Sequence, residues 1–221
     1  HFGYRRQRQM CIRDRDMSSN EFKEFNNEVL GYLRQNNLEN MISEPSSFRV
    51  IFTYMVEAIV NSLLYGLFIG ILLITLIIGL FFRSYLLPAL SIFPNILPIG
   101  MGFGLWGLFV GDVGFMVAVG MGSTLGVIVD FTVHFLSKYE LARKEFKKSV
   151  EESVIYSFET VGFALIIMTV VLALGFSVLN LVTFIPIQDF AKFSVICFIG
   201  GLIINFLFLP NLLIKFDKRK F

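Results

Sequence analysis

Five long apolar runs constrain this chain more than any other feature of its sequence. Each has about 20 residues or more, which is the length an α-helix needs to cross a hydrocarbon core of about 30 Å. A bilayer offers no water to satisfy backbone polar groups, so such segments must be helical. Of the 221 residues, 55% are hydrophobic and 16% are charged, which is unusual for a soluble domain. The sequence therefore predicts an all-α polytopic membrane protein with spans at residues 58–82, 87–110, 115–136, 160–179 and 190–214.

Lys and Arg residues are divided unevenly between the two sides of this predicted membrane domain, residues 57–217. The turn after the first span carries Arg83, and the loop 137–159 and the tail are rich in both residue types. The connections on the other side carry only Lys192. Because Lys and Arg are enriched in cytoplasmic loops, we predict that the Arg83 turn, the loop and the C-terminus, including the tail 218–221, are cytoplasmic.

The cytoplasmic loop 137–159 is charged and has one apolar stripe. Its members are spaced by four residues: Phe146, Val150, Val154 and Phe158. This pattern predicts an amphipathic helix lying on the membrane surface. A helix that binds a partner is the alternative.

Residues 16–56 are polar and lie on the exterior side of this topology. Apolar residues recur at helical spacing from Phe22 to Leu33, which predicts a helix. The short segment Phe48–Phe52 is β-prone. About 40 residues bury too little core to fold alone. We therefore expect residues 16–56 to be the C-terminal remnant of an α+β exterior domain.

Residues 1–15 contain five arginines and produce the net charge of +2. They resemble translated sequencing-adapter read-through and are expected not to be native, the alternative being a genuine basic arm. The chain is then expected to begin within a longer protein. Without these residues acids outnumber bases, so nothing indicates nucleic-acid binding.

Asp130 and His134 lie inside the third span, where ionisable side chains are costly and mark function. At four-residue spacing they share one helical face. Asp130 lies about 9 Å below the cytoplasmic edge at 1.5 Å per residue, too deep for a short carboxylate to reach water. Because carboxylate and imidazole groups exchange protons, the pair is predicted to be a proton relay. The alternatives are an Asp130 satisfied by a neighbouring helix and an interfacial His134.

Three further polar residues lie within the spans. They are Asn95 in the proline-containing second span, Thr169 in the fourth and Asn205 in the fifth. Such side chains bond across helices and satisfy carbonyls that prolines free. We predict that they support the pair by forming a polar core that faces Asp130, although each alone is more often a simple link between helices.

Glycines recur at four-residue spacing within the spans, an arrangement that lets helix backbones approach closely. The pairs are Gly66 with Gly70, Gly100 with Gly104, and Gly122 with Gly126. We predict close packing within the bundle. The alternative is that Gly120, Gly122 and Gly126, which lie on the same helix as Asp130, leave room for a neighbouring helix to move.

No nucleophile–base pair, phosphate loop or metal-ligand cluster stands out in the sequence, so we predict no enzyme activity, cofactor or metal. Cys11 and Cys197 imply no disulfide framework.

Six short motifs, in this order, resemble the C-terminal half of an MMPL-like exporter of the resistance–nodulation–division superfamily. They are Phe82–Ser84, Pro94–Ile99, Phe103–Leu108, Gly126–Asp130 with His134–Leu136, Gly175–Leu179, and Leu209–Leu213. The resemblance covers roughly residues 48–217. It implies that Asp130 is the intramembrane acid of the family and that His134 is its frequent partner. Phe131 stands where many relatives have a second acid, and Asn205 where they often have Asp.

The resemblance also implies a function. Each half of such an exporter has six helices, so this chain would supply five of them and need an N-terminal half. The implied activity is proton-driven export of hydrophobic or lipid-like molecules, in the cell (inner) membrane of a bacterium or archaeon, with a homo-oligomer as a possible assembly. The alternative is a non-transporting membrane module, either a sterol- or lipid-sensing bundle or an accessory motor for protein translocation.

Overall fold

The computed structural model describes residues 19–36, 48–111 and 113–219. The predictions for residues 1–15 and for the end of the tail therefore lie outside the described residues. The chain forms two compact units, the first ending at Ala58 and the second beginning at Ile59. Each unit is described by itself.

The first unit contains helix α2, Ser19–Gln35, and the first residues of helix α3, Phe48–Phe82. The helix predicted from the spacing after Phe22 is thus confirmed. Lys23 forms an ion pair with Glu57, and its Nζ lies 5.5 Å from the centre of the Tyr54 ring.

The α+β character expected of this region is not found. The described residues contain no strand, and the β-prone segment Phe48–Phe52 is the helical start of α3. These five residues run without a break into the long apolar run, and a helix is extended more easily than it is nucleated. Continuity with that helix explains why the local β preference does not prevail.

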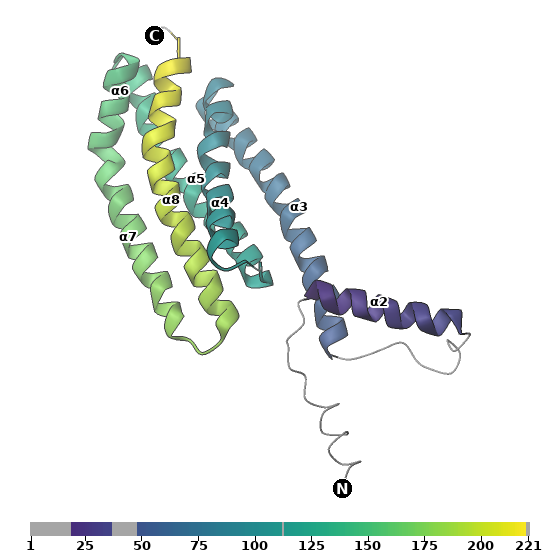
Figure 1. Ribbon diagram of the computed structural model, residues 1–221. Coiled ribbons are helices and arrows are strands. Elements are labelled where there is room, and N and C mark those ends of the chain that lie inside the picture. The colour runs from purple at the N-terminus through teal and green to yellow at the C-terminus, as the bar shows by residue number, and fades with distance from the viewer. Residues whose placement is uncertain (1–18, 37–47, 112, 220–221) are drawn as a thin grey trace. The chain divides into compact units, whose positions relative to one another are not determined.

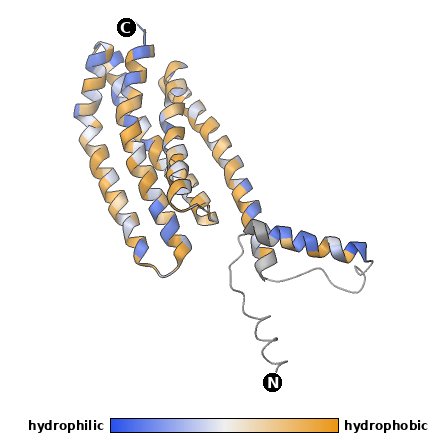
Figure 2. Ribbon diagram, in the orientation of Figure 1, coloured by the Kyte–Doolittle hydropathy of each residue, from blue (hydrophilic) through white to orange (hydrophobic). Residues whose placement is uncertain are grey.

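The second unit is a bundle of antiparallel helices (Figure 1). After α3 come α4, Leu86–Phe109; α5, Phe115–Lys144; α6, Val150–Ser157; α7, Phe163–Val178; and α8, Ile185–Phe216. In the described chain, five helical segments are long and apolar enough to cross a membrane: Thr53–Phe82, Leu86–Phe109, Phe115–Lys144, Val150–Leu181 and Ile185–Phe216. The predicted multi-pass membrane protein is confirmed at this level, and Figure 2 shows these segments as mostly hydrophobic, in contrast to α2.

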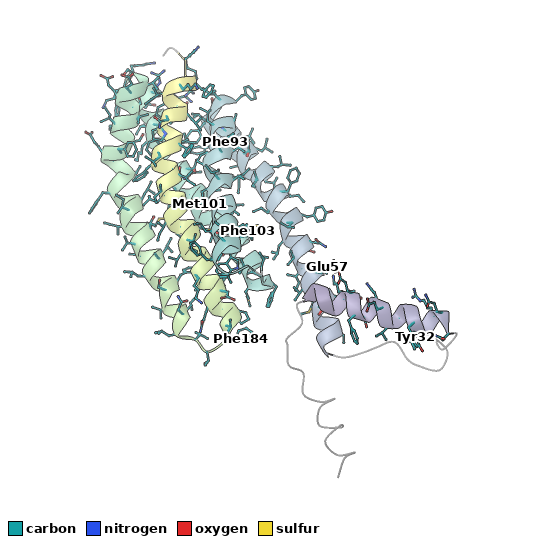
Figure 3. All side chains as sticks on the ribbon, in the orientation of Figure 1. Tyr32, Glu57, Phe93, Met101, Phe103 and Phe184 are labelled. Carbon is teal, nitrogen blue, oxygen red and sulfur yellow. The ribbon has the colours of Figure 1, made fainter. Side chains whose placement is uncertain are left out.

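Helix α8 is the centre of the bundle and packs against α4, α5 and α7. The Phe193 side chain of α8 is fully buried, and its ring centre lies 5.0 Å from that of Phe103 on α4. Figure 3 labels Phe103 on α4. By contrast, α3 keeps most of its apolar side chains exposed, including Phe68, Leu72 and Leu76. An apolar surface of this kind suits contact with lipid.

The close approaches between helices use glycines other than the predicted pairs. A Cβ added at Gly201 of α8 would lie 2.9 Å from Cγ1 of Ile128, and one at Gly120 of α5 would lie 3.1 Å from the Phe193 ring. At the six predicted positions, no described atom of another helix lies within 4 Å of an added Cβ. The four-residue spacing identified glycines within the spans, but it did not show whether they face a neighbouring helix.

The stretch 137–159 differs from the single surface helix that its stripe predicts. Helix α5 continues to Lys144, and α6 begins after a turn at Ser149, whose side chain accepts a hydrogen bond from the Glu152 N–H. Through a π-helical turn at Phe158–Gly162, α6 then runs directly into α7. Val154 of the stripe is buried in the bundle core, so much of the stripe faces protein.

Candidate functional site

Asp130 and His134 lie in contact on α5, as their spacing predicts. Nε2 of His134 is 3.3 Å from Oδ1 of Asp130. The His134 side chain keeps 57% of its surface exposed and the Asp130 side chain 44%. Within the described part of the chain, neither has another hydrogen-bond or ion-pair partner. The pair is therefore on the outside of this bundle.

The pair belongs to a longer open stripe along α5. Gly122, Gly126, Asp130 and His134 follow one another at intervals of four residues, which places them on one face. Both glycines are exposed, with open space above them. Two exposed glycines thus precede an acid and a base along one face of the helix.

A separate polar cluster is buried inside the bundle around Thr132 of α5. Its Oγ1 lies 2.7 Å from Oδ1 of Asn95 on α4 and 3.1 Å from Oδ1 of Asn205 on α8. One hydroxyl proton serves only one of these oxygens, and Nδ2 of Asn205 is buried without a hydrogen-bond partner among the described residues. The chemically consistent arrangement turns the Asn205 amide, so that Thr132 donates to Asn95 and accepts from Nδ2 of Asn205.

The predicted supporting residues therefore do not gather at Asp130. Asp130 and Thr132 are two residues apart, about 200° around the helix, so their side chains point to nearly opposite sides. Asn95 and Asn205 meet at Thr132, while Thr169 of α7 donates only to the Leu165 carbonyl of its own helix at 2.8 Å. Sequence reasoning missed Thr132. Its four-residue offset from the buried Ile128 would have placed it on the inward face of α5.

A third polar group ties the end of α5 to the residues after α8. The Arg219 guanidinium donates to both carboxylate oxygens of Glu140, at 3.0 and 2.9 Å, and to Asp217 at 2.8 to 2.9 Å. The Tyr139 hydroxyl donates to Asp217 at 2.6 Å. Burial alone would raise the pKa of Asp217, but the hydrogen bonds from Arg219 and Tyr139 outweigh it and lower the pKa to about 2. We call this group the C-terminal clasp.

The clasp also reaches the end of α3. Lys144 Nζ lies 2.9 Å from Glu140 and donates to the Phe82 carbonyl at 3.0 Å. The Arg83 turn, the end of α5 and the C-terminus therefore share one end of the bundle, as the distribution of basic residues requires (Figure 1). That this end faces the cytoplasm stays a prediction.

The Asp130–His134 pair places one carboxylate beside one imidazole. Among the described residues, no three or more His, Cys, Asp or Glu side chains are grouped so that they could hold a metal ion.

A comparison with protein-family models finds no match for the chain, and a comparison with curated proteins also finds none.

Proposed function

We propose that Asp130 and His134 form the proton relay of a membrane transporter driven by the proton-motive force. The observation that carries the proposal is the 3.3 Å contact between the two side chains on an open face of an apolar helix. An acid and a base at membrane depth are costly, and such groups line ion or proton pathways.

The exposure of Asp130 and His134 indicates that another surface covers them in the membrane. A charged carboxylate facing lipid would be strongly unfavourable, so the stripe of Gly122, Gly126, Asp130 and His134 requires a protein surface or a water-filled path beside it. Small residues let another helix come close. We infer that the other half of the same transporter covers this face, in keeping with the resemblance to exporters built from two similar halves.

The proposed chemistry is a proton transfer between two named atoms. A protonated Asp130 carboxyl donates its proton towards Nε2 of His134, which leaves a carboxylate beside an imidazolium. Loss of that proton to the other side of the membrane restores the neutral imidazole. Because each state changes the charge facing the partner helix, each favours a different packing of α5.

The proposed cargo is a hydrophobic or lipid-like molecule, and this part of the proposal rests on the resemblance alone.

The second candidate function is that of a non-transporting membrane module, such as a lipid-sensing bundle. It is favoured by the buried cluster at Thr132, whose hydrogen bonds join α5 to α4 and α8 without involving the pair. Proton flux separates the two candidates, because a sensor does not conduct protons.

The test is proton flux in proteoliposomes containing the full-length transporter, with a trapped pH-sensitive dye reporting the internal pH. Asp130→Asn keeps the size and polarity of the side chain but cannot carry a proton. We expect it to abolish flux driven by a pH gradient and His134→Gln to reduce it about tenfold or more. Asp189→Asn is the matched control, because Asp189 pairs with Lys192 at the start of α8 and not with Asp130 or His134. Unchanged flux in Asp130→Asn would refute the relay.

A further inference from the structure

An apolar groove with a volume of about 640 Å³ lies between α3 and α4. It falls within the range of about 300–1,000 Å³ that is typical of small-molecule sites. Its walls are mainly aliphatic and come from both helices: Leu72, Leu76 and Leu80 from α3, and Pro88, Ala89 and Ile92 from α4. The hydroxyl of Thr75, which also lines the groove, donates to the Ile71 carbonyl of its own helix. No described side chain fills it.

The groove has the depth of one membrane leaflet. Along α3 it extends from Leu72 to Arg83, which is about 16 Å at 1.5 Å per residue. Half of a hydrocarbon core of about 30 Å is about 15 Å. A transmembrane helix lying in the groove would need a surface about twice as long, so the dimensions suit an acyl chain better than another span.

All charge in the groove is at its mouth. Arg83, Ser84 and Tyr85 form the turn between α3 and α4, and each lines the groove. Arg83 is exposed and takes a left-handed backbone conformation with φ of 50°, and no described acid pairs with it. The neighbouring cation Lys144 is already paired with Glu140. One uncompensated guanidinium therefore stands at the polar end of a leaflet-deep apolar groove.

We propose that this groove binds one anionic phospholipid from the leaflet on the Arg83 side. The acyl chain lies against the aliphatic walls, and the phosphate accepts hydrogen bonds from Arg83, with the Ser84 and Tyr85 hydroxyls as further donors. Basic pockets between membrane helices bind anionic headgroups in this way. The lipid site lies on a different helix pair from Asp130, and it does not depend on the proposed transport function.

The experiment is a lipid titration of the purified chain, followed by native mass spectrometry, with phosphatidylglycerol and phosphatidylcholine of the same acyl composition. We expect one phosphatidylglycerol to bind about fivefold or more tightly than phosphatidylcholine, which corresponds to about 1 kcal/mol for one cation. Arg83→Gln should abolish this preference, and Arg83→Lys should retain part of it. Lys147→Gln is the matched control, because Lys147 is also exposed with φ of 51° but lies outside the groove.

A second variant tests the apolar part of the site. Ala89→Phe fills the groove and should weaken binding of both lipids without changing the helical circular dichroism. An unchanged preference in Arg83→Gln, or unchanged binding in Ala89→Phe, would overturn the proposal. So would cross-linking of a Leu80→Cys variant to a second protein chain in the membrane, since that would show a protein as the occupant. Glycerol phosphate that competes as well as the lipid would show an anion site without acyl recognition, and would also overturn it.

Discussion

Replacing Thr132 by valine should destabilise the bundle more than the same change elsewhere in its interior. The substitution keeps the shape of the side chain and removes one hydroxyl that is fully buried between Asn95 and Asn205. Both amides then lose their shared partner. Leaving a buried polar group unsatisfied costs about 1–3 kcal/mol in water-soluble proteins. Interhelical hydrogen bonds in membranes are worth about 0.6 kcal/mol on average, with a maximum near 1.7. We expect a loss of about 1–2 kcal/mol.

Thr169→Val is the matched control for this prediction. Thr169 is also buried, but its hydroxyl donates only to the Leu165 carbonyl within α7. Such bonds back to the preceding turn add little to helix stability, so we expect a loss below about 0.5 kcal/mol. The difference between the two variants isolates the bond across helices from the general effect of adding a methyl group.

The assay is reversible unfolding in mixed micelles with increasing denaturing detergent. The chain has one tryptophan, Trp106, which is buried against the Phe193 ring on α8, so its fluorescence reports the loss of α4–α8 packing. A double-mutant cycle with Asn205→Leu should give a coupling energy of about 1 kcal/mol. Equal losses for Thr132→Val and Thr169→Val, or additive effects in the cycle, would refute the hydrogen-bonded cluster.

Three further predictions concern packing and the ends of helices. Gly201→Ala should lower the free energy of unfolding in micelles by about 1–3 kcal/mol, because the added Cβ meets Ile128. Gly126→Ala should not lower it, because the space around Gly126 is open. Equal losses in the two variants would contradict this packing. Ser149→Ala should destabilise the start of α6 by about 1 kcal/mol, seen as faster hydrogen exchange there and not in α8. The pKa of Asp217 is lowered from 3.8 to about 2, so its stabilisation is present above pH 4 and is lost as the pH falls towards 2. Hydrogen exchange after α8 should therefore accelerate over that interval, and Arg219→Gln should already accelerate it at pH 7.

The spans could be predicted from the sequence because membrane insertion depends mainly on how long an apolar run is. Their ends were less predictable. The residues after Leu136 continue α5 because Glu140 and Lys144 pair with each other and Glu140 also with Arg219, 79 residues further on. A local pattern does not reveal a partner at that distance, and the apolar stripe from Phe146 to Phe158 suggested a separate surface helix.

Contacts between side chains could be predicted from the sequence only where both residues lie on the same helix. Asp130 and His134 meet because any α-helix brings residues four apart together. The partners of Asn95 and Asn205 depend on how three helices are rotated against one another, which spacing does not determine. Asn95 and Asn205 were expected at Asp130, and they lie at Thr132 instead.

The two polar faces of α5 have different roles under the proposed function. The inward face, at Thr132, is closed by hydrogen bonds to α4 and α8, and the outward face, at Asp130, is open. No described hydrogen bond connects them, so a change of charge at Asp130 reaches the interior only by moving α5 as a whole. We therefore expect the two substitutions to affect different properties. Thr132→Val should lower the stability of the bundle, and Asp130→Asn should stop proton flux without unfolding it. A Thr132 variant of full stability that no longer conducts protons would show that the relay runs through the buried cluster.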